Sequence, residues 1–542
     1  MLGALAGVVA AVVALGVAEL IAGLRAVWRS PVIDVGDRVI DNVPVFVKDF
    51  AIDTFGTNDK PALLIGIGAT LLVYAAVIGA LAFRYRIWIG LVGIGVFGLI
   101  GAWAANSNRA GGSLDDAIPT VIGALVGAGA LLLVHRIAAP ILTPAGDAPA
   151  ETDEVDEVDE VDTEEITGGT VTSSAGATRG RTRRELLILC GGVLAGLAIV
   201  GAGAGAVGRK VRSRFSATES RMNVTLPAPA EALDAVPADV EVGVDGVASF
   251  VTSNADFYRI DTALSVPQVL TEGYTLRVTG MVDNELEISF EELLRRNVVE
   301  HDITLTCVSN TVGGELIGNA RWLGVRLDEL LEAASVQSGA TQVVGRSIDG
   351  YTCGFPIEAA TDGRNALVAF GMNGEPLPLE HGFPVRLIVP GLYGYISATK
   401  WLTEIELTTF EDFEQYWVPR GYADRAPIKL MSRIDSVDGL GTLTRSPDGI
   451  AAIGGVAWAQ TRGISAVEVQ IDDGEWQPCE MGAALNDDTW RQWAYRWTPA
   501  AEGRASIRCR AIDGNGEIQT DARSEPLPDG ASGHHQIVVF VV

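Results

Sequence analysis

The chain has 542 residues, 48% of them hydrophobic, with a mean hydropathy of +0.26, a formal net charge of −28 and an isoelectric point near 4.5. So apolar an average excludes an ordinary soluble enzyme, and so acidic a balance excludes nucleic acid, whose phosphates bind Lys and Arg. The two properties are compatible only if apolar and acidic parts are segregated along the chain. The negative charge also favours a high-salt, halophile-like host, because salt screens self-repulsion.

Residues 1–140 contain four apolar runs, each about the length of a helix that spans a bilayer, and a fifth run follows a polar linker. The runs cover Met1–Leu24, Pro61–Phe83, Ile87–Ala105, Pro119–Ala138 and Leu186–Val207. They are rich in Gly and Ala, which lets helices approach closely in lipid, and they lack a polar face. We therefore predict transmembrane helices over residues 1–140 and a fifth transmembrane helix over residues 185–208.

Residues 141–184 are predicted to be an acidic, disordered linker, because the repeat Asp153–Asp162 offers little apolar surface to bury. The linker ends in Arg183-Arg184, directly before the fifth apolar run. This pair resembles a twin-arginine export signal placed internally. It also fits the positively charged flank that any membrane span can have.

Arg84 and Arg86, in the short turn between the second and third runs, favour the cytoplasmic side. Since each span crosses the membrane once, the linker then lies on the cytoplasmic side and everything after Val207 lies on the opposite side. Local charge alone leaves this orientation open, because the segment after the fifth run is also basic. We expect a cell-membrane protein whose C-terminal domains lie on the extracytoplasmic side.

Residues 216–430 mix short strands and helices, which is typical of an α+β domain. The predicted elements are strands at Tyr274–Gly280, Ala366–Phe370 and Val385–Val389, a short helix at Ser289–Arg296 capped by Ser289, and an amphipathic helix at Leu323–Ala334. Residues 435–542 show strands alone, at Ile464–Ile471, Trp493–Trp497, Ala505–Ala511 and Gln536–Val542. This second pattern predicts an immunoglobulin-like β-sandwich.

Five cysteines are scattered along the chain without a Cys-x-x-Cys pair, which argues against zinc and iron–sulfur frameworks. Cys307 is the most informative of them. It follows the apolar run Ile303–Thr306 and opens into a loop that contains Gly313-Gly314. A lone buried cysteine is most often a small core residue, but a thiol at the end of a strand can also be a soft metal ligand.

Four motifs identify a family. They are Leu367–Arg386, Val389–Gly391, Lys400-Trp401 and Asn319–Leu327. From about Val251 to the C-terminus the chain resembles the sulfite oxidase family of molybdopterin-dependent oxidoreductases. The resemblance implies a multi-domain chain, with a molybdopterin-binding α+β domain and then an immunoglobulin-like domain of the kind that forms homodimers.

By this resemblance, Cys307 is the metal ligand, because a thiolate is soft and stabilises a high-valent metal such as molybdenum. The expected cofactor-binding residues are Arg259, Asn310, His381, Arg386, Thr399 and Lys400. Arg and Lys suit the phosphate of molybdopterin, and an imidazole can donate to the polar pterin ring. The expected catalytic residues are Cys307, Arg259 and Tyr422, with Tyr422 bonding substrate and passing protons.

Two positions depart from the pattern of the sulfite-oxidising members. Val312 stands where they have an anion-binding arginine, and Asp261 replaces a histidine. A further family arginine comes from the sandwich domain, and Arg491 or Arg496 could supply it. Fewer arginines predict weaker binding of sulfite.

We therefore expect a membrane-anchored molybdenum oxidoreductase that transfers an oxygen atom to or from a small sulfur species such as sulfite. A protein that loads such a cofactor in the cytosol must cross the membrane folded, which favours the export interpretation of Arg183-Arg184. No haem is evident, since His135 is the single histidine of residues 1–140, so electrons would need a separate protein or subunit. Alternatives are a sulfoxide reductase of the same fold and, from another class, a cofactor-free membrane receptor.

Overall fold

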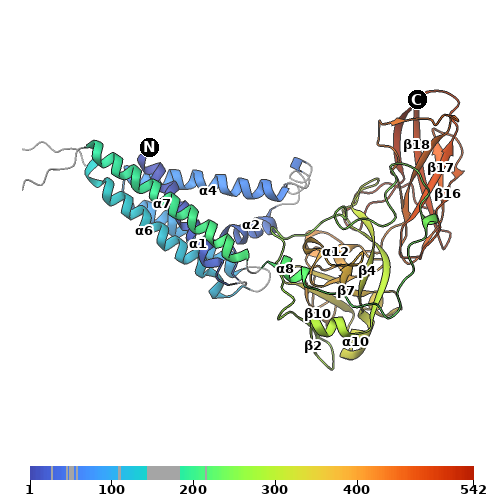
Figure 1. The fold of residues 1–542 in the computed structure, drawn as a ribbon, viewed down its shortest axis with the longest axis horizontal. Coiled ribbons are helices and arrows are strands. Elements are labelled where there is room, and N and C mark those ends of the chain that lie inside the picture. Colours follow the sequence, from blue (N-terminus) through green and yellow to red (C-terminus); the bar gives the residue numbers. More distant parts are fainter. Residues whose placement is uncertain are drawn as a thin grey trace, which may run out of the picture. The chain divides into compact units, whose positions relative to one another are not determined.

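The computed structural model describes residues 1–25, 28–43, 47, 54–55, 59–107, 112–142, 183–213 and 216–542. The predicted acidic linker, including Asp153–Asp162, lies almost entirely outside the described residues. Contacts divide the chain into two compact units, a helical one that ends near residue 214 and a second one that begins at residue 215 (Figure 1).

The first unit is built from long apolar helices. They are α1 (Leu2–Ala22), α4 (Asp59–Arg84), α5 (Ile87–Asn106), α6 (Ile118–Leu142, preceded by the 3-10 turn Leu114–Ala117) and α7 (Arg183–Arg212). By length and composition, five helices in the described residues could cross a membrane, as the sequence predicted. Helix α1 packs against α4, α6 and α7.

Glycines allow this close packing. A Cβ atom at Gly16 of α1 would lie 1.9 Å from the carbonyl oxygen of Gly201 on α7. A Cβ atom at Gly7 would lie 2.0 Å from the carbonyl oxygen of Ala75 on α4. Since no side chain fits at these distances, the backbones themselves form the contact, which is typical of helices that associate in lipid.

Helix α2 (Pro31–Asn42) lies between the first two apolar runs, where the sequence predicted no element. Pro31 occupies the first turn, where its missing N–H group costs nothing. Arg29, just before the helix, pairs with Asp34 and Asp37. The helix has only 12 residues and carries Asp34, Asp37, Arg38 and Asp41, so neither apolar length nor a strand pattern revealed it.

The second unit begins with an α+β domain of two sheets. One sheet has the order β2–β1–β10–β5–β6, and the other has the order β3–β4–β7–β8 with β9 paired to β7. The strands are β1 (Thr275–Gly280), β2 (Leu286–Ser289), β3 (Val298–Thr306), β4 (Ile317–Arg326), β5 (Gln342–Ser347), β6 (Thr352–Pro356), β7 (Leu367–Met372), β8 (Glu375–Pro376), β9 (Arg386–Ile388) and β10 (Leu402–Thr408). The helices are α8 (Ala217–Met222), α9 (Phe290–Arg295), α10 (Leu327–Ala334), α11 (Glu358–Thr361) and α12 (Gly394–Ser397), with 3-10 turns at Ala238–Val240, Leu379–His381 and Val418–Arg420.

Most local predictions hold in this domain, and one is wrong. Ser289 caps α9 through a complete capping box with Glu292. The predicted helix Leu323–Ala334 begins only at Leu327, because Leu323–Arg326 form the end of β4 and pair with β7. Sheet pairing therefore overrides the amphipathic spacing in that first turn.

The second part of this unit is a β-sandwich, as predicted. Its sheets have the orders β11–β13–β17–β16 and β12–β19–β18–β14–β15. The strands are β11 (Met431–Ile434), β12 (Thr442–Leu443), β13 (Ala451–Trp458), β14 (Ile464–Ile471), β15 (Gln477–Pro478), β16 (Glu480–Met481), β17 (Arg491–Trp497), β18 (Gly503–Asp513) and β19 (His535–Val541). Trp493 and Cys509 are fully buried in its core.

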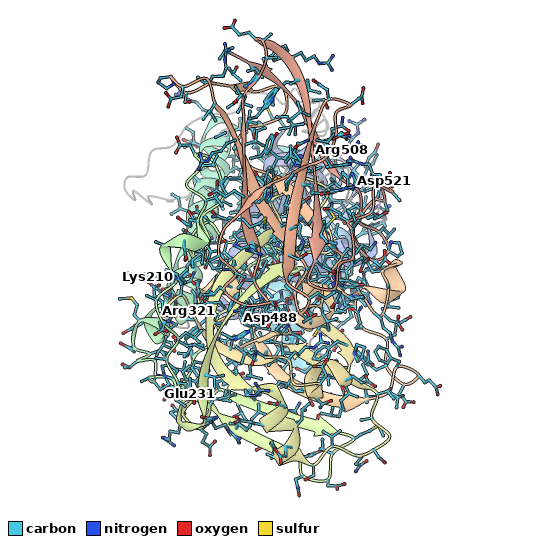
Figure 2. The ribbon with its side chains drawn as sticks, turned by 90° about the vertical axis from the view of Figure 1, so that its right-hand side faces the viewer. Lys210, Glu231, Arg321, Asp488, Arg508 and Asp521 are labelled. Carbon is cyan, nitrogen blue, oxygen red and sulfur yellow. The ribbon has the colours of Figure 1, made fainter. Side chains whose placement is uncertain are left out.

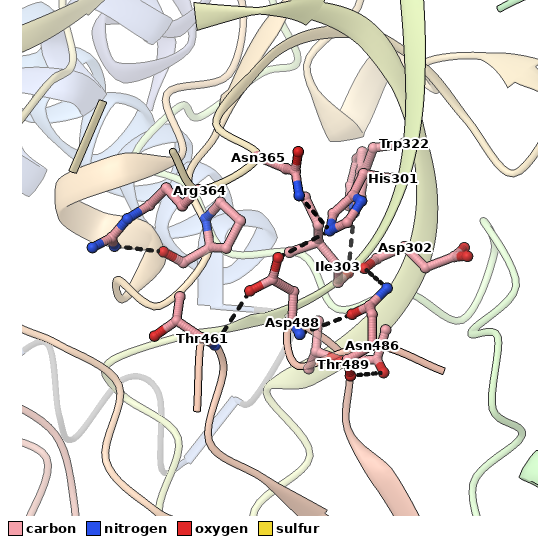
Figure 3. A network of polar contacts seen from close by, with 12 residues as sticks. His301, Asp302, Ile303, Trp322, Arg364, Asn365, Thr461, Asn486, Asp488 and Thr489 are labelled. Carbon is pink, nitrogen blue, oxygen red and sulfur yellow. Dashed lines mark hydrogen bonds and ion pairs between the residues drawn. The ribbon is translucent and has the colours of Figure 1, made fainter. Parts of the chain in front are cut away.

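Loops of the sandwich cover one edge of the α+β domain. The main chain of Thr304 on β3 donates to Asp488 O at 3.0 Å, and Thr304 O accepts from Gln460 Nε2 at 2.9 Å. The Asp488 carboxylate contacts His301 at 2.9 Å and accepts from the Thr461 N–H at 3.2 Å (Figure 3). Figure 2 shows Asp488 between Arg508 of the sandwich and Glu231 of the α+β domain. The outer edge of β3 is thus paired rather than exposed.

Candidate active site

One pocket in the α+β domain gathers side chains from distant parts of the sequence. Its interior encloses about 110 Å³, several times the roughly 10–15 Å³ that one water molecule needs. The lining includes Tyr258, Asp261, Cys307, His381, Arg386 and Lys400. Cys307, His381, Arg386 and Lys400, which the sequence analysis assigned to one site, therefore do line one cavity.

Cys307 is positioned by the end of β3. Its N–H donates to Leu316 O at 2.9 Å, and its carbonyl oxygen accepts from the Asn310 N–H at 3.0 Å. The residue is only 7% exposed. Burial raises the pKa of the thiol, while hydrogen bonds with Ser309 and the charge of Lys400 act in the opposite direction. The thiol is thus buried from bulk solvent yet faces the pocket.

Arg386, His381 and Trp322 form a group that we call the Arg386 cluster. The Arg386 Nη1 donates to His381 O at 3.0 Å, and its guanidinium lies 5.1 Å from the centre of the Trp322 ring. Its Nε has no hydrogen-bond partner, and none of the ion pairs in the described residues involves it. Burial lowers the pKa of Arg386 to about 10. A buried cation without an acid is costly, so this arrangement suits an anion that binds from the pocket.

The His381 ring is held by backbone. Its Nε2 donates to Asn254 O at 3.0 Å, because a carbonyl can only accept. Burial, Arg386 and Lys400 lower the pKa of His381 to about 4, so the imidazole is neutral near pH 7. A neutral ring beside two cations can offer its other nitrogen as an acceptor to a polar ligand.

Arg259, Asp261 and Lys400 form a second group, the Asp261 cluster. Asp261 Oδ2 accepts from Lys400 Nζ at 2.8 Å and from Arg259 Nε at 2.9 Å. Lys400 Nζ also donates to Glu380 O at 3.0 Å. Burial lowers the pKa of Lys400 to about 8, although the Asp261 carboxylate opposes the shift. Here the positive charges are already balanced by protein.

Other predicted cofactor-binding residues lie behind the pocket wall. Asn310 uses its Oδ1 to accept from the Leu316 N–H at 2.9 Å, which closes the loop after Cys307. Thr399 is fully buried, and its hydroxyl donates to Cys353 Sγ at 2.7 Å. Both residues shape the wall, and neither is among the residues that line the cavity.

The predicted catalytic residues other than Cys307 also lie outside the lining. Arg259 reaches the pocket only through Asp261. The Tyr422 ring packs 5.3 Å from Trp417 and 5.5 Å from Tyr395, and these two aromatic residues line the pocket in its place. The sandwich arginines Arg491 and Arg496 are engaged within their own domain, the first with Gly482 O and Ile464 O, the second with Glu480.

Sequence reasoning missed several lining residues, including Tyr258, Asp349 and Tyr351. Tyr258 is the sequence neighbour of Arg259, which was expected to bind the cofactor, so its position was a usable signal. Asp349 and Tyr351 lie in and after the turn between β5 and β6, and no motif marks them. Burial raises the pKa of Tyr258 and of Tyr351, so both phenols stay protonated.

Comparison with known proteins finds a family match in the α+β domain that contains this pocket. Residues 263–417 match the family described as the oxidoreductase molybdopterin binding domain. The chain is 29% identical to mitochondrial sulfite oxidase of Rattus norvegicus over 318 residues, which cover 50% of this chain and 58% of the rat protein. It is 35% identical to the uncharacterized oxidoreductase YuiH of Bacillus subtilis over 149 residues, 28% of this chain and 72% of that protein.

Among solved structures, the sulfane dehydrogenase SoxCD from Paracoccus pantotrophus aligns with a TM-score of 0.44 and 21% identity, covering 54% of this chain and 81% of that chain. The chain thus spans somewhat more than half the length of the curated sulfite oxidases it matches. The matched domain defines the class, an oxidoreductase with a molybdopterin-binding domain. Within that class, the chain belongs to the sulfite oxidase family. This membership confirms the predicted family and excludes the cofactor-free receptor.

The family implies a molybdopterin cofactor, and the residues present fit it. The unpartnered Nε of Arg386 and the charge of Lys400 suit its phosphate. The neutral His381 suits a polar ring, and the Cys307 thiol supplies a soft ligand in the same cavity.

Proposed function

We propose that this protein is a membrane-anchored molybdopterin oxidoreductase that transfers an oxygen atom to or from a small sulfur species such as sulfite, outside the cytoplasm. One observation carries the proposal: the Cys307 thiol shares a cavity with Arg386, a buried cation that lacks an acidic partner. A thiol and a cation poised for an anion are the two groups that a phosphate-bearing metal cofactor requires.

In this proposal, each side chain has a physical task. Arg386 and, more weakly, Lys400 bind the cofactor's phosphate, the Nδ1 of His381 accepts a hydrogen bond from the ring system, and Cys307 holds the metal, molybdenum or tungsten. When bound, the cofactor supplies the centre that exchanges oxygen and electrons with the substrate. Tyr258 remains protonated and can donate to substrate oxygen, because burial raises the pKa of its phenol, whereas the Tyr351 hydroxyl already donates to Tyr395 O at 2.6 Å.

Arg259, Asn310, Thr399 and Tyr422 act from behind the pocket wall. Arg259 holds Asp261, and Asn310 closes the loop of Cys307. Thr399 bonds Gly345 O and Cys353. Tyr422 packs on Trp417 and Tyr395, two residues that line the pocket, and in this proposal its hydroxyl bonds the substrate and passes protons.

The membrane anchor and its orientation rest on the helical unit. Five apolar helices are long enough to cross a bilayer, and the Arg84–Arg86 turn favours the cytoplasm. Arg183 and Arg184 begin α7, which suits export of a folded, loaded protein. Electrons would pass to or from a separate protein or subunit, and the sandwich domain would form a homodimer.

Reduction of a sulfoxide is the second candidate, and the charge of the pocket favours it. Two carboxylates, Asp261 and Asp349, belong to the lining, whereas both Lys400 and Arg259 are engaged with Asp261. Val312, at the position of the family's anion-binding arginine, packs against the hydrophobic core. A neutral S-oxide tolerates such a pocket better than the sulfite dianion does.

A two-way substrate test decides between these reactions. Purified full-length protein is assayed with sulfite and an artificial electron acceptor, and separately with methyl sulfoxides and an artificial donor. We expect turnover in at least one direction, and Cys307→Ser should lower it by about 1,000-fold or more, as loss of a residue at the reacting centre typically does. Turnover in neither direction, or full activity of Cys307→Ser, would contradict the proposal.

A further inference from the structure

Two residues of the β-sandwich contact the loop that carries Cys307, residues 307–316, which we call the Cys307 loop. Arg433 on β11 donates from Nη1 to Gly314 O at 2.8 Å. His535, the first residue of β19, lies so close to Gly313 that a Cβ atom there would be 2.4 Å from its Nε2. The backbone of Gly313 has a φ of +81°, which only glycine adopts easily. The tip of the loop is therefore held against the sandwich.

Both contacting side chains are themselves fixed. Arg433 is 8% exposed, and its Nε donates to Asp435, whose side chain is 6% exposed. The N–H of Ile434 donates to His535 Nδ1 at 3.0 Å, so the ring proton sits on Nε2, the atom next to Gly313. Because each partner has one arrangement, the pair forms a rigid surface for the loop.

The other end of the Cys307 loop is tied by short main-chain and side-chain bonds. Cys307 N–H donates to Leu316 O at 2.9 Å, and Leu316 N–H donates to Asn310 Oδ1 at 2.9 Å. A Cβ atom at Gly314 would lie 2.6 Å from the same Asn310 oxygen. A shift of the tip would therefore push Asn310 and, through it, the turn that places the thiol.

We propose that Arg433 and His535 are positioning residues, through which the sandwich domain sets the place of the Cys307 thiol in the pocket. The inference rests on the proposed role of Cys307 as metal ligand. It gives the sandwich a task in the reaction that the arginines first considered for this domain, Arg491 and Arg496, do not perform. The Asp488 contacts (Figure 3) join the same two domains at β3, and the Arg433 contact acts on the loop that follows this strand.

The first test uses full-length protein produced without cofactor. Alkylation of Cys307 by iodoacetamide is followed by residue-resolved mass spectrometry, because a buried thiol reacts only when its loop opens. We expect Arg433→Met to react about tenfold faster than the unmodified chain, while Arg433→Lys, which keeps a donor, stays near the original rate. An unchanged rate in folded Arg433→Met would overturn the proposal.

Arg445→Met is the matched control. Arg445 also bonds a carboxylate, Glu502, and a main-chain carbonyl, Val542 O, but both lie within the sandwich. Its rate should equal that of the unmodified chain, and an equal acceleration there would show a general loosening and refute the specific role. If Arg433→Met does not fold, Gly313→Ala tests the same contact from the loop side, and alkylation at the original rate would again overturn the proposal.

The second test uses cofactor-loaded protein and separates this inference from the proposed function. Arg433→Met should change the paramagnetic resonance signal of the reduced metal and lower kcat with little change in KM. Arg433→Lys should restore both, and Arg445→Met should alter neither. Faster alkylation without any change in the metal signal would support the contact between the sandwich and the Cys307 loop. It would also show that Cys307 does not bind the metal, and it would therefore contradict both the proposed function and the positioning role.

Discussion

The Arg386 cluster and the Asp261 cluster line the same pocket but balance charge in different ways. Arg386 is buried with one carbonyl partner and an unpartnered Nε. Lys400 and Arg259 instead share the carboxylate of Asp261. A protein that leaves one buried cation unbalanced while pairing the others reserves that one for an external anion. The comparison therefore makes Arg386 the principal anchor for a cofactor's phosphate and Lys400 a weaker one, whereas the Asp261 and Asp349 carboxylates make the remaining pocket wall nearly neutral.

Arg386→Met should have the largest effect, because it removes the one buried cation of the pocket that lacks an acidic partner. Without the cation, retention of the cofactor should fall by about 30-fold or more, because truncating one partner of a buried charge pair typically costs about 2–5 kcal/mol. The cofactor-free protein should be equally or more stable, since an uncompensated buried charge has been removed. Pterin content and denaturant unfolding of the cofactor-free form measure the two effects.

The control for Arg386→Met is Arg326→Met, which removes a paired arginine from the same domain. It should lower stability slightly and leave pterin content unchanged. If Arg386→Met keeps its full cofactor content, or if both variants lose it equally, Arg386 is an ordinary buried residue.

Asp349→Asn tests whether the carboxylates of the pocket wall weaken the binding of an anionic substrate. The Asn side chain still accepts from the Tyr351 N–H, as the Oδ1 of Asp349 does at 3.1 Å, but the negative charge is gone. Affinity for sulfite should rise by about fivefold, the effect of roughly 1 kcal/mol of relieved repulsion at a partly screened site. Affinity for a neutral sulfoxide should not change, and KM for each substrate gives the answer. A fall in sulfite affinity would contradict the account.

The smallest expected effect is a pH dependence of anion binding that arises from Lys400. Its pKa is lowered to about 8, so the charged form that attracts anions prevails below that pH and is lost above it. Binding of inorganic phosphate to cofactor-free protein should weaken by about threefold to fivefold between pH 7 and 9. In Lys400→Met this step should vanish, whereas an identical pH profile in the variant would place the titrating group elsewhere. Titration calorimetry measures the profile.

The sequence revealed the membrane helices and the sandwich through physical patterns, but it revealed the site largely through resemblance. Apolar length alone predicted α1, α4, α5, α6 and α7, since a bilayer demands it. Cys307, His381, Arg386 and Lys400 were recognised by motif, and the fold brings them to one cavity. The spacing of residues in the sequence did not predict Asp349 or Tyr351, which reach the pocket from a turn that contains no recognised motif.

Other details could not be predicted because they depend on tertiary contacts. The start of α10 was placed too early, since pairing of β4 with β7 decides it. Asn310 and Thr399 were expected to bind the cofactor, and in the structure the side chain of each forms a hydrogen bond within the pocket wall. The ion pair between Lys400 and Asp261 joins residues 139 positions apart, so it follows from three-dimensional packing alone.

The central claim is that the pocket holds a metal cofactor through Cys307. X-ray absorption spectroscopy at the molybdenum or tungsten edge of the purified full-length protein tests it most directly, with pterin fluorescence as a second readout. The account predicts a bound metal with sulfur neighbours, and loss of a sulfur neighbour in Cys307→Ser while pterin remains bound. Absence of metal and pterin, or an unchanged sulfur count in Cys307→Ser, would contradict it.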